Sequence, residues 1–171
     1  MRTLCVLLTL AGAQAAAPPK PLTPIEASTH QFQCLGRKVQ LGEFLLPKQI
    51  VAAGQGLLSS PIRLVAEPAI FDRLKTKSRL VRNDGTSAEW VCSGESQDCR
   101  LLVKLTADCD GFCWYEMTLT PKRPLKVGAL RLEIPRMKAT ARYLHTAEYD
   151  WSNVSGGLPE MGGKWSGQFV P

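Results

Sequence analysis

Alternation of apolar and polar residues dominates the second half of the chain and predicts β-strands. Every second residue is apolar in residues 101–107, in residues 113–119 and in residues 130–134. Successive side chains of a strand point to opposite faces, so a period of two is the pattern of a strand with one buried face. In the first run, the residues expected to point inward are Leu101, Val103, Leu105 and Ala107. In the other two, the residues expected in the core are Met117, Leu119, Leu130, Leu132 and Ile134.

Two Asp-Gly dipeptides mark tight turns between such runs. Glycine takes positive φ values without strain, and Asp-Gly is a strong hairpin signal. Asp84-Gly85 precedes a short run in which Trp90 lies on the face expected to be buried, and Asp110-Gly111 joins two of the alternating runs. Twelve prolines and fourteen glycines favour many short strands over long helices. The sequence therefore predicts an all-β fold, an antiparallel β-sandwich of about seven to nine strands.

The first residues have the organisation of a secretory signal peptide. The positive charge of Arg2 is followed by the apolar run Leu4–Leu10 and then by Ala13-Gln14-Ala15, which fits a small-x-small cleavage pattern. The apolar run is too short for a membrane span, and an uncleaved N-terminal anchor is the alternative. We therefore expect a secreted or periplasmic protein, with no membrane span in the mature chain.

The chain divides into three expected parts. Residues 1–16 form the signal peptide, residues 17–29 a Pro/Ala-rich linker, and residues 30–171 the β-sandwich domain. Within the domain, residues 150–168 are rich in Gly, Ser and Trp and predict a long loop of the kind that is usually functional or docked on a neighbour. The last residues, 169–171, have the character of a strand that is just beginning. We therefore expect the domain to be incomplete at its C-terminus.

Charge does not point to a nucleic-acid partner, although the formal net charge is +6. The basic residues are scattered along the chain, and a nucleic acid is not the partner expected of an exported protein. The densest basic run, Arg73–Arg82, is either a solvated strand or loop face or an attractor for an acidic polymer.

Five cysteines follow the leader, and an exported chain can keep disulfides. Cys92 and Cys99 flank a loop-like hexapeptide, so a bridge between them is the first choice. Cys109 and Cys113 straddle the second Asp-Gly turn and form the second candidate pair, which leaves Cys34 unpaired. A zinc site is the alternative, but only the second pair has the spacing of a zinc knuckle, so no metal and no other cofactor is expected.

Short motifs in order along the chain resemble a known family. The resemblance covers most of residues 37–171 and rests on turns and strand ends. The matching segments are Leu45-Leu46-Pro47, Ser60-Pro61-Ile62-Arg63-Leu64, the Asp110-Gly111 turn, Leu130-Arg131-Leu132-Glu133-Ile134-Pro135 and Trp165-Ser166-Gly167-Gln168-Phe169-Val170-Pro171. They resemble the N-terminal domain of proteins similar to glycoside hydrolase family 123.

The resemblance implies a β-sandwich that precedes a (β/α)-barrel hydrolase acting on glycans that contain N-acetylhexosamine. In that family the catalytic Asp-Glu pair lies in the barrel, so the resemblance assigns no catalytic residue to this chain. Asp108 with Asp110, and Glu148 with Asp150, are neighbouring acids, but such neighbours arise by chance in a chain with fifteen acidic residues. No G-x-S-x-G elbow surrounds any serine.

Three tryptophans are candidates for binding carbohydrate or for docking another domain. Trp114 is out of phase with the buried positions of its run, so it is expected to face away from the core. It packs against another domain or offers a platform for a sugar ring. Trp151 and Trp165 lie in the Gly-rich segment, where they either anchor their own loop or bind sugar.

The leading functional hypothesis is a non-catalytic N-terminal domain of an exported glycoside-hydrolase-like protein. It would support a catalytic barrel that this chain lacks. The first alternative is a stand-alone secreted carbohydrate-binding module, and the second is a self-sufficient hydrolase. The expected partners are the missing barrel and glycans.

Overall fold

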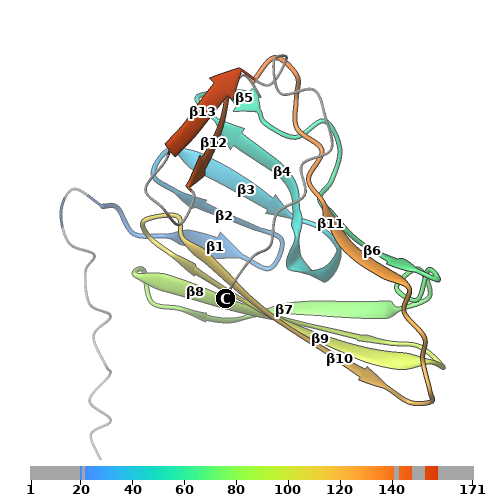
Figure 1. The fold of residues 1–171 in the computed structure, drawn as a ribbon. Coiled ribbons are helices and arrows are strands. Elements are labelled where there is room, and N and C mark those ends of the chain that lie inside the picture. The colour runs from blue at the N-terminus through green and yellow to red at the C-terminus, as the bar shows by residue number, and fades with distance from the viewer. Residues whose placement is uncertain (1–19, 21, 141–142, 148–152, 158–171) are drawn as a thin grey trace, which may run out of the picture.

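Two antiparallel sheets lie face to face in the computed structural model, which describes residue 20 and residues 22–140, 143–147 and 153–157. Neighbours in the first sheet follow the chain order β1-β2-β3-β4-β5, and the second has the order β10-β9-β8-β7 (Figure 1). The strands of the first sheet are β1 (Glu26–Ser28), β2 (Gln31–Cys34), β3 (Arg37–Leu41), β4 (Pro47–Ala52) and β5 (Gln55–Gly56). Those of the second are β7 (Lys75–Asn83), β8 (Ser87–Glu95), β9 (Cys99–Asp108) and β10 (Cys113–Pro121).

Four further strands form two antiparallel ribbons. β6 (Arg63–Glu67) pairs with β11 (Ala129–Glu133), and β12 (Tyr143–Ala147) pairs with β13 (Asn153–Gly157). The single helical element of the described residues is the 3-10 turn η1 (Glu43–Leu45). The prediction of an all-β antiparallel fold is confirmed, and the two main sheets hold five and four strands. In the described residues, no helix has the length and apolar character that a bilayer crossing needs.

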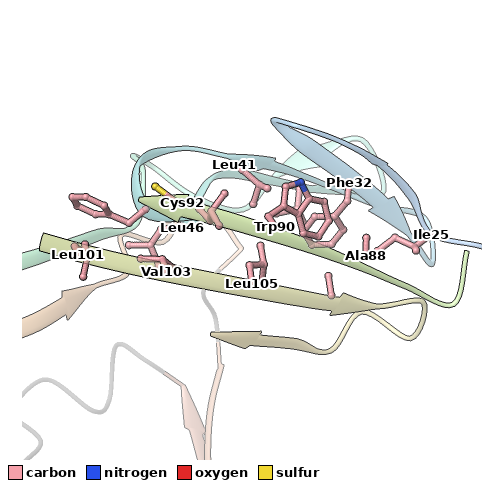
Figure 2. Close-up of a cluster of buried hydrophobic side chains, with 14 of the residues drawn as sticks. Ile25, Phe32, Leu41, Leu46, Ala88, Trp90, Cys92, Leu101, Val103 and Leu105 are labelled. Atoms are coloured by element: carbon pink, nitrogen blue, oxygen red, sulfur yellow. The ribbon is translucent and has the colours of Figure 1, made fainter. Parts of the chain in front are cut away.

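The core lies between the two main sheets. Figure 2 shows Phe32 and Leu41 of the first sheet pointing toward Trp90 of the second. The ring centroids of Phe32 and Trp90 are 5.5 Å apart, and the indole Nε1 of Trp90 donates to the carbonyl oxygen of Ser28 at 2.8 Å. A buried indole N–H needs such a partner, so this bond joins β8 to β1 at little desolvation cost. The buried face predicted for β9 is confirmed for Leu101, Val103, Leu105 and Ala107.

Both predicted hairpin turns are present. Gly85 and Gly111 have φ values of 82° and 88°, in the left-handed region that favours glycine. Beside Gly85, Oδ1 of Asp84 accepts hydrogen bonds from the backbone N–H groups of Thr86 and Ser87 at 3.0 and 2.8 Å. These bonds hold the β7–β8 turn closed, as an Asx turn does.

The burial predicted for the last alternating run is wrong. The exposed fraction is 59% for Leu130, 50% for Leu132 and 53% for Ile134. Met117 on β10, which was also expected in the core, is 36% exposed. The alternation itself is correct, because Leu130 and Leu132 stand opposite Ala66 and Leu64, which contact the core. β11 pairs with β6 and belongs to neither main sheet (Figure 1), and its two leucines are exposed.

Two boundaries also need correction. Ile25 is buried in the core and its N–H donates to the carbonyl of Gly85 at 2.8 Å, and β1 follows directly. The expected linker at 17–29 is therefore wrong in its second half, since the domain includes residues before 30. The long loop expected at 150–168 contains β13. The expected signal peptide, residues 1–16, lies outside the described residues.

Candidate functional site

The outer face of the four-stranded sheet carries the most exposed aromatic side chains of the described residues. Trp114 on β10 is 58% exposed, whereas the next residue, Tyr115, points inward and donates from its hydroxyl to the carbonyl of Leu45 at 3.1 Å. Burial raises the pKa of the Tyr115 hydroxyl, so Tyr115 stays a neutral donor. Strand alternation therefore turns Trp114 away from the core, as its phase in the sequence predicted.

Phe112 extends the aromatic surface of Trp114. The two rings are stacked, with centroids 6.5 Å apart and an interplanar angle of 25°, and Phe112 is 56% exposed. Phe112 is not among the aromatic residues predicted from the sequence to bind a ligand or another domain. Its signal was available, because Phe112 is two residues before Trp114 and so shares its phase. Exposed aromatic rings in one layer form a flat apolar platform.

Polar side chains from three strands surround this platform, which we call the Trp114 face. In the strand register, Trp114 lies opposite Thr106 of β9, and Thr106 lies opposite Glu89 of β8. Two residues further along, Lys104 faces Glu116, with 3.7 Å between Nζ and Oε2. These five side chains line a shallow depression of about 220 Å³. The Trp114 face therefore offers hydrogen-bond donors and acceptors beside an apolar platform.

Glu89 is held in place by its neighbours on the sheet. Its Oε1 accepts from Nη2 of Arg82 at 2.6 Å, and the same guanidinium also pairs with Asp84. The ion pairs of this face are exposed, so their contribution to stability is small. Their effect is to fix the direction of the Glu89 carboxylate, which leaves it able to accept hydrogen bonds from a ligand's hydroxyl groups.

A second hollow, of about 360 Å³, lies between η1, β6 and β11. Its walls include Phe44 and Phe71, and its lining includes Arg63, Arg131 and Glu133. Hydrogen bonds from Arg131 and Arg63 hold the pKa of Glu133 below its usual range. A glycosidase needs one carboxyl with a raised pKa as general acid, and Glu133 has the opposite shift.

Two of the acids singled out in the sequence, Asp108 and Asp110, line neither of these two hollows. Asp108 and Asp110 lie at the β9–β10 turn, where Oδ1 of Asp110 accepts from the N–H of Phe112 at 2.8 Å. Asp110 therefore shapes the turn that presents Phe112 and Trp114. Glu148 and Asp150 lie outside the described residues, as do Trp151 and Trp165.

All five cysteines of the described residues are free thiols, so neither predicted bridge is formed. Cys92 lies opposite Val103 of β9, and Cys99 is four positions away along that strand, from 99 to 103. Four residues of strand span roughly 13 Å, whereas a disulfide needs Cα atoms within about 7 Å. The predicted Cys92–Cys99 bridge is therefore wrong. The reason is that β8 extends to Glu95, into the hexapeptide predicted to be a loop.

The second predicted bridge joined Cys109 and Cys113. Cys109 is buried in the core, while the Sγ of Cys113 is directed at the carbonyl oxygen of Gly111, at 3.8 Å. In the described part of the chain, no group of three or more His, Cys, Asp or Glu side chains is placed to hold a metal ion.

Comparison with family models identifies the family of this chain. Residues 25–166 match the model described as "Glycoside hydrolase 123, third domain". The match covers most of the chain, so the chain belongs to the glycoside hydrolase 123 family, and the resemblance found in its motifs is confirmed. The model names a third domain, and in this chain the matched unit begins at residue 25. Searches of curated proteins and of solved structures found no match.

Proposed function

We propose that this chain is a non-catalytic β-sandwich domain of an exported glycoside-hydrolase-like protein, and that it supports a catalytic domain outside this chain. The family match supports a role within a glycoside-hydrolase-like protein, and a family model named for a third domain implies proteins with other domains. The location outside the cytoplasm follows from the expected signal peptide at residues 1–16.

The exposed apolar row on β11 is the observation that carries the supporting role. Leu130 and Leu132 of β11, and Ile134 directly after its end, are each at least half exposed, and a row of exposed apolar side chains of this size marks a contact surface. Ion pairs of Arg131 with Glu67 and of Arg63 with Glu133 flank the row. An apolar centre with a charged rim is the anatomy of a domain interface. The occupant we propose is the catalytic domain of the same protein.

Association with a separately produced catalytic domain of a glycoside hydrolase 123 protein tests this role. The wild-type chain is expected to bind the domain on a biosensor surface. The double substitution L130S/L132S is expected to weaken binding at least about tenfold, because two central apolar contacts are lost. Val81→Ser, at an exposed position of β7, is the matched control and is expected to bind like wild type. Equal binding by all three proteins would contradict the proposal.

A second candidate function is carbohydrate binding on the Trp114 face, and the stacked Phe112–Trp114 pair is the observation that favours it. Aromatic platforms stack on the apolar faces of pyranose rings, and Glu89, Lys104 and Thr106 are positioned to bond hydroxyl groups. A glycan array that includes N-acetylhexosamine glycans tests it. Binding is expected from wild type and lost in Trp114→Ala, while Met117→Ala, also exposed on β10, keeps it. Binding that survives Trp114→Ala would place the sugar elsewhere.

A further inference from the structure

The tips of two hairpins, one from each main sheet, meet at one end of the sandwich. The β2–β3 hairpin brings Cys34 and Arg37, and the β9–β10 hairpin brings Gly111 and Cys113. A Cβ atom built on Gly111 would lie 3.2 Å from Nη2 of Arg37 and 3.6 Å from Sγ of Cys34. The two tips are therefore packed against each other at Gly111.

Two thiols approach this contact from opposite sheets. Cys34 is buried with its Sγ beside Gly111, and Cys113 directs its Sγ at the Gly111 carbonyl oxygen, at 3.8 Å. Both side chains line one hollow of about 200 Å³, together with Phe32 and Tyr115. Cys109 belongs to the core but not to the lining of this hollow. The hollow gives the two sulfur atoms room to rotate toward each other.

We propose that Cys34 and Cys113 form a disulfide that ties the five-stranded sheet to the four-stranded sheet. The oxidant is a small disulfide of the glutathione type, such as an exported chain meets in an oxidising compartment. The thiolate of Cys113, the less buried of the two, attacks one sulfur of the oxidant and releases one small thiol. The thiolate of Cys34 then attacks the Sγ of Cys113 in the mixed disulfide and releases the second small thiol. Two protein thiols are oxidised, and their two protons pass to the two released thiols.

Burial makes this exchange slow without raised pH or an enzyme catalyst. It raises the pKa of the Cys34 thiol, and it raises that of Cys113 to about 11, whereas Arg37 opposes the shift at Cys34. Only the thiolate attacks a disulfide, so the experiment is done at a pH of about 8.5 with hours of equilibration.

Peptide mapping of the full chain tests the proposal. The reduced protein is equilibrated with reduced and oxidised glutathione, its remaining thiols are alkylated, and it is digested with trypsin and Asp-N. Cleavage before Asp110 separates Cys109 from Cys113, so the two candidate partners of Cys34 fall on different peptides. The expected result is a cross-linked peptide pair that contains Cys34 and Cys113 and disappears on reduction. A bridge of Cys34 to Cys109, a bridge of Cys109 to Cys113, or complete alkylation of all thiols would overturn the proposal.

Cysteine variants test whether the cross-linked peptide pair and the gain in Tm both depend on the Cys34–Cys113 bridge. Cys34→Ser and Cys113→Ser are each expected to abolish the cross-linked pair, while Cys92→Ser and Cys109→Ser keep it. The bridge closes a loop of nearly eighty residues, so oxidation is expected to raise the Tm of wild type by on the order of 10 °C. The same treatment is expected to leave the Tm of Cys113→Ser unchanged.

Discussion

Two tryptophans show how strand phase decides the role of a residue. Trp90 and Trp114 lie in strands of the same sheet, two strands apart. Trp90 points inward, is fully buried and donates its indole N–H to Ser28, whereas Trp114 points outward and stacks on Phe112. Alternation in the sequence predicted both directions, because each run has several apolar residues that fix its phase.

Substitution of the two tryptophans should therefore have unequal effects on stability. Trp90→Ala removes a fully buried ring and is expected to lower the free energy of unfolding by about 3–5 kcal/mol. Trp114→Ala, at the exposed position, is expected to cost less than about 1 kcal/mol. Urea unfolding followed by circular dichroism measures both. Trp90→Phe, which keeps most of the packing, provides an intermediate if the alanine variant does not fold. Equal losses at the two positions would contradict the assigned directions.

Asp84 predicts a dependence of stability on pH. Hydrogen bonds from the backbone of Ser87 and from Thr86 hold the pKa of Asp84 below its usual value in the folded chain. A lowered folded-state pKa contributes stability that is fully present above the unfolded-state pKa of about 4. This stability is lost as pH falls through the folded-state pKa. The Tm of Asp84→Asn is therefore expected to be below that of wild type at neutral pH, and the difference should shrink as pH falls below the unfolded-state pKa and through the lower folded-state pKa.

Thermal melts of wild type and Asp84→Asn across this range make the comparison. Asp72→Asn, at an exposed turn position, is the matched control for the loss of one carboxylate. A Tm difference for Asp84→Asn that is constant from neutral to acid pH would show that the charge of Asp84 plays no part.

At the scale of elements, two strands with the same alternation of apolar residues differ in how deeply those residues are buried. β9 and β11 have the same alternation, yet β9 lies between β8 and β10 while β11 has β6 as its single neighbour in the sheet. Period two predicts which side chains share a face, but the number of layers over that face depends on distant segments. The sequence could therefore predict the direction of Leu132 and not its exposure.

The unequal burial of these two strands can be measured. Leu105→Ala on β9 is expected to lower the free energy of unfolding by about 2–5 kcal/mol, because the leucine is completely buried. Leu132→Ala on β11 is expected to cost less than about 1 kcal/mol in the isolated chain. Urea titration of both variants gives the comparison. A large loss for Leu132→Ala would mean that β11 is covered within this chain.

The register of the β8–β9 hairpin could not be predicted from the spacing of its two cysteines. The residues between Cys92 and Cys99 had the composition of a loop, but β8 continues to Glu95 and the turn is short. Cys92 and Cys99 therefore lie at different positions along the paired strands and do not face each other. The basic run in β7 has a simpler explanation, since Lys75, Lys77 and Arg79 are exposed on an edge strand. Charges of this kind protect an edge from pairing with another chain.

For the whole molecule, the sequence predicted the fold class and the family, and both are confirmed. It did not predict that Cys34 meets the β9–β10 turn, because that contact joins residues more than seventy positions apart in two different sheets. It predicted Trp114 as exposed and missed Phe112, whose role depends on the stacking of the two rings. The alternation within each strand thus predicted which face of the strand a side chain lies on. The contacts between the two sheets could be found only in the three-dimensional structure.

The central claim is that this chain supports carbohydrate chemistry without performing it. Hydrolysis of aryl N-acetylhexosaminides by the purified chain tests this most directly, with an N-acetylhexosaminidase as positive control. The claim predicts release of the aryl group at the rate of the protein-free blank. Release above the blank that falls when one carboxylate is replaced, for example in Glu133→Gln, would contradict it and place a catalytic site within these residues.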